Sequence, residues 1–322
     1  MVCLPAMKTL RHRSIFPYLI LLGGVSIAST AAIMITLAQD AGAPPLTIAA
    51  GRIAFAALIL TPIAWGRAAG DIRSIGRRDI GLALLSGAFL AVHFASWISS
   101  LAYTSVASST ALVTTNPVFV ALVSFLFWGE RINRRAMFGI VLTLLGSLLI
   151  ALSDQSGGSG TNPLLGDLLA LIGALCVTGY FLIGRELRRH MAILPYIWLV
   201  YSSAAVILLA WMTAVGQSLF GLSPFVYLLL IGLAVGPQLL GHTSFNWSIK
   251  YLSATFVTVA ILAEPIGSSV LALLLLPNQQ LQTLQVLGGL LLLAGIAMAT
   301  LAERTTERRA SVLAEAEGAV AP

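Results

Sequence analysis

Ten apolar stretches of 17 to 25 residues occupy most of this 322-residue chain. A helix needs about 20 mostly apolar residues to cross a hydrocarbon core of about 30 Å. The chain is 58% hydrophobic and only 9% charged, a composition that few water-soluble domains could bury. We therefore predict an all-α membrane protein of ten transmembrane helices, over residues 16–38, 46–65, 80–101, 106–128, 136–152, 164–184, 194–215, 223–247, 254–276 and 282–302.

Lysine and arginine are concentrated in the two terminal segments and in every second connection between the apolar stretches. Seventeen of the eighteen lie there, in groups that begin at Lys8, Arg67, Arg131, Arg185, Lys250 and Arg304, and the exception is Arg52. Cytoplasmic loops carry the excess of basic residues, so both termini are predicted to be cytoplasmic. Ten buried helices of a soluble protein would not produce this alternation. The net charge of +6 is thus assigned to topological anchors beside the lipid bilayer, and no nucleic-acid partner is expected.

A polar linker, residues 153–162, divides the ten stretches into five and five. The halves align with each other: at an offset of 148 the matches are Tyr103, Ser105, Thr110 and Pro117 with Tyr251, Ser253, Thr258 and Pro265. We expect one repeat over residues 1–155, a second over 156–310 and a disordered tail over 311–322. Because each repeat has an odd number of helices, the two are inverted in the membrane. Inverted repeats are typical of secondary transporters, whose substrate site lies near the midplane.

Two motifs resemble those of the EamA proteins in the drug/metabolite transporter superfamily. The first runs from Asn116-Pro117-Val118-Phe119 to Trp128-Gly129-Glu130-Arg131, and the second copy is Ala263-Glu264-Pro265-Ile266-Gly267. Ala50-Gly51-Arg52-Ile53 is similar to the arginine-bearing second helix of that family, and the likeness covers about residues 16–304. The second half departs from the pattern, with Leu276-Pro277-Asn278 where the first has Gly129-Glu130. The resemblance is strongest to the YddG-type exporters of aromatic amino acids, and implies an exporter in the bacterial plasma (inner) membrane.

Glu264 and Asn116 occupy equivalent places in the two repeats, and each precedes a proline. Both lie about ten residues into their helices and so near the midplane. Pro117 and Pro265 lack the N–H that closes a helical turn, which predicts two hinges. Glu264 is a candidate for binding a substrate ammonium group or for carrying a proton. The alternative, that the carboxyl is neutral and bonded to neighbouring hydroxyls, is equally open.

Three further ionisable residues lie inside the spans, where charged groups are costly and each is a functional candidate. Arg52 can bind a substrate carboxylate, but we favour the alternative that it snorkels outward or bonds carbonyls of a neighbouring helix. His93 and His242 are equivalent in the repeats, and inversion predicts His93 toward the periplasm and His242 toward the cytoplasm. Trp97 and Phe245, with Phe94 and Trp247, offer aromatic faces beside them for an aromatic substrate. A lone histidine on an apolar helix is more often a packing residue, and that alternative stays open for both.

Glycines seven residues apart, Gly139 and Gly146 in the first repeat and Gly288 and Gly295 in the second, predict close helix packing. This packing can join the fifth and tenth helices or two copies of the chain, so monomer and homodimer both stay open. Cys3 and Cys176 form no metal motif, and the sequence has neither a Walker motif nor HExxH. We expect no enzyme activity, no cofactor and no metal.

Together these features predict a secondary transporter that works by alternating access around a midplane cavity. Its substrate is a small amphipathic metabolite, with aromatic amino acids as the best single candidate. Cationic drugs, nucleobases and sugar derivatives are the alternatives, and a passive channel or a non-transporting scaffold is also open. Export follows from the resemblance alone. Both proton coupling and facilitated diffusion are compatible with the residues.

Overall fold

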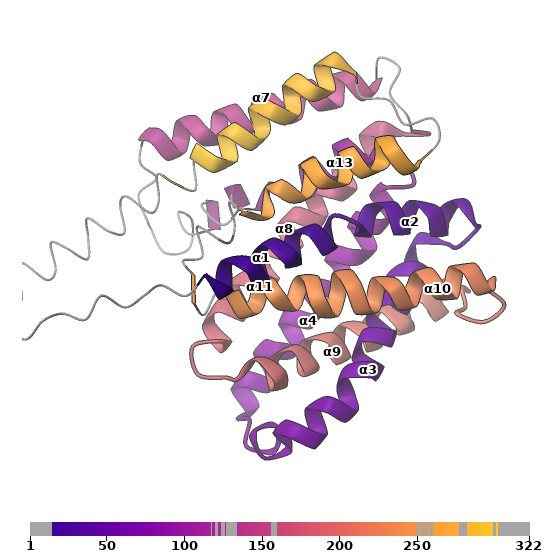
Figure 1. The fold of residues 1–322 in the computed structure, drawn as a ribbon, viewed down its shortest axis with the longest axis vertical. Coiled ribbons are helices and arrows are strands. Elements are labelled where there is room, and N and C mark those ends of the chain that lie inside the picture. The colour runs from indigo at the N-terminus through magenta and orange to yellow at the C-terminus, as the bar shows by residue number, and fades with distance from the viewer. Residues whose placement is uncertain are drawn as a thin grey trace, which may run out of the picture.

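The computed structural model describes residues 15–116, 118–119, 122–123, 126, 134–155, 160–248, 251–252, 257, 260–276, 282–298 and 301. Over these residues the chain is helical and contains no strand. The helices lie side by side in one bundle, as Figure 1 shows. Their bounds are α1 (Phe16–Ala28), α2 (Ala31–Asp40), α3 (Pro45–Arg73), α4 (Arg77–Ser100), α5 (Val106–Val113), α7 (Arg134–Gln155), α8 (Pro163–Leu187), α9 (Ile193–Ala214), α10 (Pro224–Leu233), η1 (Ala234–His242), α11 (Thr243–Ser248), α13 (Ala263–Leu275) and a last helix over Thr283–Met298.

Six helical segments are long and apolar enough to cross a bilayer. They are Phe16–Asp40, Pro45–Arg73, Arg77–Ser100, Pro163–Leu187, Ile193–Ala214 and Pro224–Ser248. Shorter apolar helices cover Met137–Ile150, Ala263–Leu275 and Thr283–Met298. These segments agree with the predicted spans in order and approximate position. Parts of the predicted spans 106–128 and 254–276 lie outside the described residues.

The predicted second span is too short, because α3 continues from Pro45 to Arg73 where the apolar stretch ends near Trp65. Apolarity marks the part of a helix that lies in lipid, whereas the backbone hydrogen bonds continue beyond it. Near its end α3 bends at Ala68, which has φ −138° and ψ 22°. This bend follows Pro62 and Gly66, residues that weaken the helix by removing a donor and by adding backbone freedom.

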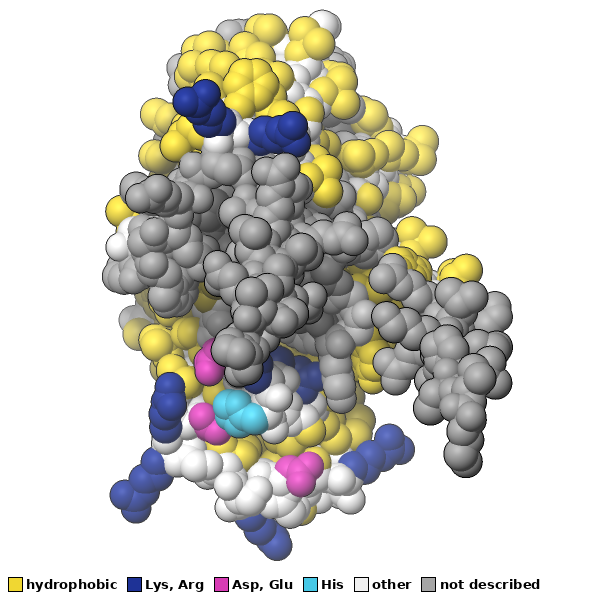
Figure 2. All heavy atoms as spheres, turned by 90° about the vertical axis from the view of Figure 1, so that its left-hand side faces the viewer, with side chains coloured by type: hydrophobic (Ala, Val, Ile, Leu, Met, Phe, Trp, Pro, Cys, Tyr) yellow, Lys and Arg dark blue, Asp and Glu magenta, His cyan; other side chains and the backbone are white. Residues whose placement is uncertain are grey.

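Basic side chains gather at one end of the bundle, which Figure 2 views directly. The described ones come from the end of α3, the start of α4, the start of α7 and the end of α8, and include Arg67, Arg73, Arg77, Arg78, Arg134, Arg135, Arg185 and Arg189. The arrangement agrees with the alternation of charge along the sequence. One end of the bundle is therefore basic, as expected of a cytoplasmic face.

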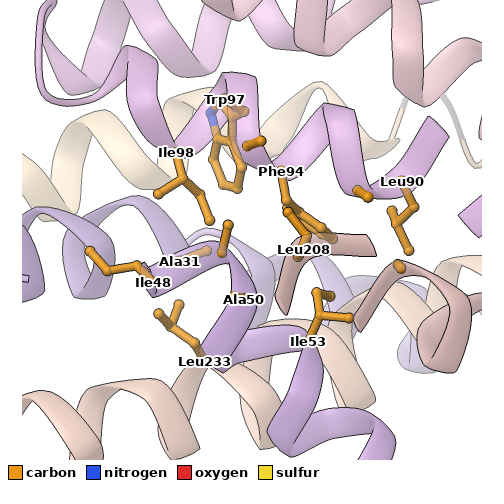
Figure 3. Close-up of a cluster of buried hydrophobic side chains, with 14 of the residues drawn as sticks. Ala31, Ile48, Ala50, Ile53, Leu90, Phe94, Trp97, Ile98, Leu208 and Leu233 are labelled. Carbon is orange, nitrogen blue, oxygen red and sulfur yellow. The ribbon is translucent and has the colours of Figure 1, made fainter. Parts of the chain in front are cut away.

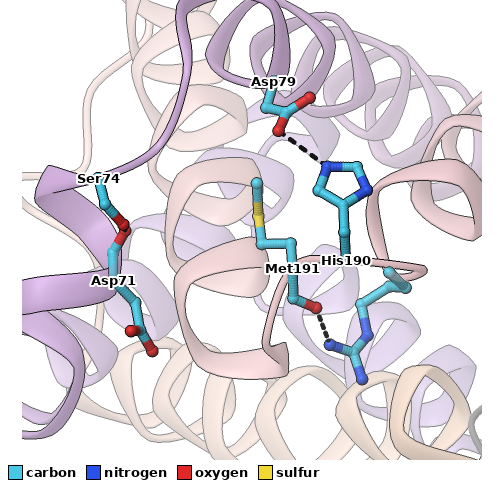
Figure 4. Close-up of polar contacts among 6 residues, drawn as sticks. Asp71, Ser74, Asp79, His190 and Met191 are labelled. Atoms are coloured by element: carbon cyan, nitrogen blue, oxygen red, sulfur yellow. Dashed lines mark hydrogen bonds and ion pairs between the residues drawn. The ribbon is translucent and has the colours of Figure 1, made fainter.

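At this basic end a polar contact joins α4 to the connection between α8 and α9 (Figure 4). His190 Nε2 lies 2.8 Å from Asp79 Oδ2 in the first turn of α4. Arg188 Nη1 donates to the carbonyl of Met191, which closes the turn that begins α9, and Ser74 Oγ donates to the carbonyl of Asp71. These contacts fix the loops that connect the helices outside the predicted hydrocarbon region.

Helices from the first half of the chain pack mainly against helices from the second half. α3 packs on α9, α4 on α8 and α9, and α5 on α13. α1 and α2 pack on the continuous segment made of α10, η1 and α11. At the top of Figure 1, α7 lies beside the last helix, Thr283–Met298. The two halves are thus interleaved rather than separate domains.

Small and large apolar side chains alternate in the largest buried cluster, shown in Figure 3. Ala50 and Ile53 of α3 face Phe94 and Ile98 of α4, and Leu233 of α10 closes the other side. Large apolar residues also cover the outside of the bundle, among them Leu58, Leu144, Leu228 and Leu274. An apolar surface of this extent requires another apolar phase, and lipid supplies it.

Close contact between α7 and the last helix depends on the glycines that the sequence indicated. A Cβ at Gly146 would lie 2.5 Å from the backbone nitrogen of Leu292, and one at Gly295 would lie 2.6 Å from the Gly139 carbonyl oxygen. A Cβ at Gly288 would lie 2.9 Å from the Gly146 carbonyl oxygen. The prediction of close helix packing is confirmed, and of the two arrangements left open the structure has the fifth helix on the tenth within one chain.

We expect Gly146→Leu to lower the thermal unfolding midpoint of the purified protein in detergent, because the new side chain meets backbone atoms that cannot move aside. Overpacking of this kind costs about 1–3 kcal/mol or more. The matched control is Gly289→Leu, since no atom lies within 4 Å of a Cβ there. Equal midpoints for the two variants would show that α7 and the last helix do not pack as described.

Candidate functional site

A small cavity lies inside the bundle, where α4, α5, α8, η1, α11 and α13 approach one another. Its volume is about 50 Å³, which holds a few water molecules and is less than the several hundred Å³ of typical ligand sites. The lining residues are His93, Trp97, Val113, Thr114, Asn116, Val177, Phe181, His242, Phe245, Ile261 and Glu264. The sequence analysis proposed seven substrate-binding side chains, and six of them line this cavity. The seventh is Arg52.

Two helices that contribute to the cavity are interrupted beside it. The helical run that begins with α5 turns at Thr114 and Thr115, and the run before α13 turns at Leu262. Pro265 explains the second interruption: it has no N–H to donate to the carbonyl of Ile261, four residues earlier. Pro117, the other predicted hinge, lies outside the described residues. Interrupted helices at a buried site are what transporters use to present backbone groups to a solute.

Both residues that precede the predicted hinges are held by hydroxyl groups from the opposite half of the chain. Thr178 of α8 donates to the carbonyl of Asn116 at 3.2 Å. Ser29, in the turn between α1 and α2, donates to the carbonyl of Glu264 at 3.4 Å. Ser29 and Thr178 are themselves 149 positions apart, one more than the offset of 148 that relates Asn116 to Glu264. Each hydroxyl has a nearer acceptor in its own helix, Val25 for Ser29 and Ala174 for Thr178, both at 2.9 Å, so its single proton is shared between two carbonyls. The side chains of Asn116 and Glu264 line the cavity.

Glu264 lies in the first turn of α13, where the amino end of the helix favours a negative charge. Its side chain is partly exposed, and the exposure is to the cavity. Among the described residues its carboxylate forms no ion pair. Arg52 is close enough for the two charges to interact, although the two side chains form no ion pair. Glu264 is therefore a carboxyl group available to a solute.

The two histidines line the same cavity and differ in how they are held. His93 Nδ1 lies 2.9 Å from the carbonyl oxygen of Gly173, so Nδ1 is the donor and Nε2 of the neutral ring is left as an acceptor. Trp97 stacks on His93, with 6.0 Å between ring centroids. His242 packs against Phe94 at 5.5 Å and Phe245 at 5.7 Å, and no described residue bonds its Nδ1.

His93 and His242 both approach one aromatic side chain, and the prediction that they lie on opposite sides of the midplane stays a prediction. The ring of Phe94 contacts both, at 4.8 Å from His93 and 5.5 Å from His242. His242 ends η1, a π-helix of nine residues, and a helix closed by i→i+5 bonds advances less per residue than an α-helix. The chain therefore travels a shorter distance through the bundle than residue counting suggested. Pro237 within η1 was the signal in the sequence.

Arg52 is completely buried next to the cavity but does not line it. Its Nε donates to the side-chain oxygen of Gln238 at 3.2 Å. The centre of the guanidinium group lies 4.1 Å from the ring centroid of Phe94 and 6.0 Å from that of Trp97. The interpretation that Arg52 snorkels outward is wrong, because α3 turns this side chain toward the interior, where α4, α9 and η1 cover it.

Sequence reasoning missed five cavity residues, namely Val113, Thr114, Val177, Phe181 and Ile261. These are ordinary residues of apolar helices, and no pattern separates the face that lines a cavity from the face that packs. Gln238 was also missed. As a glutamine inside an apolar span it carried a signal, because a buried amide requires a partner.

Comparison with known proteins identifies the family. Residues 15–152 and residues 164–301 each match the model of the EamA-like transporter family. The chain belongs to the EamA-like transporter family. Its relatives in this family include the uncharacterized transporter YdfC of Bacillus subtilis, which is 24% identical over 68% of this chain and 71% of its own length.

Two other EamA-like relatives extend the comparison. An uncharacterized transporter of Archaeoglobus fulgidus is 24% identical over 86% of this chain and 96% of its own. The pseudopaline exporter CntI of Pseudomonas aeruginosa is 27% identical over 58% of this chain and 63% of its own. A solved crystal structure aligns with 91% of this chain and 99% of its own, with a TM-score of 0.61 and 19% identity. That likeness concerns the fold alone.

Proposed function

We propose that this EamA-like transporter is a ten-helix carrier that moves small amphipathic metabolites by alternating access, with aromatic amino acids as the first candidates. The observation that carries the proposal is the cavity itself, which combines one carboxyl group, one amide and two imidazoles with the aromatic faces of Trp97, Phe181 and Phe245. Aromatic faces suit an aromatic ring, and Glu264 suits an ammonium group.

The arrangement of the helices supports two inverted repeats, over residues 1–155 and 156–310. With the ten predicted spans numbered in order, the fourth packs on the ninth, the fifth on the tenth, and the second on the seventh. The third packs on the sixth and the first on the eighth, which is the same relation with the repeats exchanged. A pseudo-two-fold axis in the membrane plane accounts for all five pairs and passes near the cavity.

Alternating access also requires movement, because the cavity is too small for an amino acid. Pro117 and Pro265 are the proposed hinges, and Asn116 and Glu264 are the groups whose positions those hinges control. His93 and His242 are proposed to bond the polar part of the substrate, with Trp97 and Phe245 against its ring. One face of the bundle opens while the contacts at the other face persist.

Export is supported by the relative that is named an exporter, of pseudopaline, although a carrier runs in either direction along its gradients. The test is uptake of radiolabelled phenylalanine and tryptophan into proteoliposomes, with and without a pH gradient. The proposal predicts uptake that saturates with concentration. Competition by an organic cation, a nucleobase or a sugar, without competition by either amino acid, would remove aromatic amino acids and leave a carrier of another solute.

We also propose that the basic end of the bundle faces the bacterial cytoplasm, with both termini there. In a variant whose Cys3 and Cys176 are replaced by serine, Ser218→Cys is expected to react with a membrane-impermeant maleimide added to intact cells after outer-membrane permeabilisation. The matched variant Ser74→Cys, in an equally exposed loop at the basic end, is expected to react only after the inner membrane is opened. The reverse pattern would invert the orientation.

A further inference from the structure

Several buried groups that can donate hydrogen bonds gather beside the cavity without an acceptor. Nη1 and Nη2 of Arg52 have no hydrogen-bond partner among the described residues. Nε2 of Gln238, Oη of Tyr201 and Oγ1 of Thr243 also form no hydrogen bond of normal length and angle there, although the Tyr201 hydroxyl is close enough to Gln238 and Thr243 to interact with both. They come from α3, from α9 and from the continuous segment of η1 and α11, so both halves of the chain contribute. None of these side chains was singled out by the sequence except Arg52.

The four side chains form one locus. Arg52 and Gln238 are bonded through Nε and Oε1 at 3.2 Å, so the terminal amino groups of Arg52 and the amide nitrogen of Gln238 lie next to each other. Tyr201 is adjacent to Gln238, Thr243 and Arg52. Arg52, Gln238 and Tyr201 are each 0% exposed, so no lipid headgroup reaches them.

Burying these groups lowers the stability of the protein unless a bound group accepts their hydrogen bonds. A buried donor without a partner costs about 1–3 kcal/mol, and a cation within a membrane costs more. The cation–π contact of the guanidinium with Phe94 stabilises the buried charge by about 0.5–2 kcal/mol. This is less than the cost of burying two amino groups without hydrogen bonds. An anion with at least two oxygens would accept from these donors. A carboxylate has this form and pairs with a guanidinium through two parallel bonds.

The same two aromatic side chains, Trp97 and Phe94, border both the locus and the histidines of the cavity. Trp97 lines the cavity and also lies 6.0 Å from the guanidinium, and Phe94 lies between Arg52 and the two histidines. Movement of these two aromatic rings would therefore join the locus to the cavity. A solute in the joined space would have Glu264 near one end and Arg52 near the other.

We propose that Arg52, Gln238, Tyr201 and Thr243 form a carboxylate-binding subsite of the transport cavity, closed in this conformation by Phe94 and Trp97. The inference rests on the proposed transport function and narrows it. The substrates are carboxylates, such as amino acids, and not simple amines. Gln238 acts by positioning Arg52 through its Oε1 and by donating through Nε2.

Three ligands of the same ring and chain length test this subsite: phenylalanine, 3-phenylpropionate, which lacks the ammonium group, and phenethylamine, which lacks the carboxylate. Their affinities are measured by ligand-dependent thermal stabilisation in detergent. The wild type is expected to bind the two carboxylates at least tenfold more tightly than the amine.

Arg52→Lys, Gln238→Leu and Tyr201→Phe are each expected to weaken binding of the carboxylates about tenfold and to leave binding of the amine unchanged. Tyr227→Phe, whose hydroxyl bonds the Leu219 carbonyl away from the cavity, is the matched control.

The outcomes separate the subsite from the carrier. Equal affinity for the amine and the carboxylates, or variants that weaken all three ligands alike, would overturn the subsite while a saturable carrier stands. Binding of 3-phenylpropionate that depends on Arg52, without transport of any amino acid, would support the subsite and overturn the amino acid proposal. Failure of every ligand to stabilise the wild type would overturn both.

Discussion

Replacing Glu264 with glutamine is expected to reduce the initial rate of phenylalanine uptake into proteoliposomes, at concentrations below saturation, by about 10- to 100-fold. The carboxylate forms no ion pair with a described residue and faces the cavity, so its charge is available to the ammonium group. Hydrogen bonds to a charged group contribute about 1.5–3 kcal/mol, and each 1.4 kcal/mol is a factor of ten. Glutamine keeps the shape of the side chain and removes the charge.

Two control variants test whether the loss of uptake is caused by removing the charge at Glu264. Glu264→Asp keeps the charge and is expected to retain more activity than the glutamine variant. Glu186→Gln removes an exposed carboxylate at the basic end of α8, which pairs with Arg189, and is expected to transport at the wild-type rate. Wild-type uptake by Glu264→Gln would remove this residue from the mechanism and favour a neutral, structural carboxyl.

Replacing Arg52 with methionine is expected to raise the thermal unfolding midpoint of the unliganded protein and to abolish binding of 3-phenylpropionate. Methionine fills much of the same space and removes a buried cation with two unbonded amino groups. Exchanging buried charges for apolar groups of similar volume is often stabilising, by about 1–4 kcal/mol. Residues kept for function commonly reduce stability in this way.

The midpoint is measured in detergent without ligand, beside Arg185→Met as the control, because Arg185 is exposed in the last turn of α8. The control is expected to unfold at the wild-type temperature. A large drop in the midpoint of Arg52→Met would show that Arg52 holds α3, α4 and η1 together, a structural role that the orphaned amino groups argue against.

Much of the fold could be predicted from the sequence because lipid imposes simple requirements. A span must be apolar and about 20 residues long, and its basic flanks must stay on one side. Glu264, His93 and His242 could be identified for a related reason, because an ionisable group in an apolar span has a high free-energy cost and is therefore a functional candidate. The equivalence of the two halves predicted that Glu264 meets Asn116 near the midplane, but it predicted His93 and His242 on opposite sides of it.

Other features depended on contacts that a linear reading does not contain. The turn between α1 and α2 falls at Ser29 and Thr30, where no proline or glycine marks it. The Oγ of Ser268 on α13 bonds the Ser29 carbonyl at 3.0 Å, so a partner far along the chain satisfies the broken turn. The orientation of Arg52 had the same cause, because Gln238 and Phe94 become its neighbours only after the halves interleave.

The central claim, that one cavity is exposed alternately to the two sides of the membrane, is tested most directly by counterflow. Proteoliposomes are loaded with excess unlabelled phenylalanine and diluted into a trace of labelled phenylalanine. A carrier predicts that the label accumulates inside above its external concentration and then declines as the internal pool is exhausted. Label that only equilibrates, at a rate proportional to concentration, would contradict alternating access and indicate a passive channel.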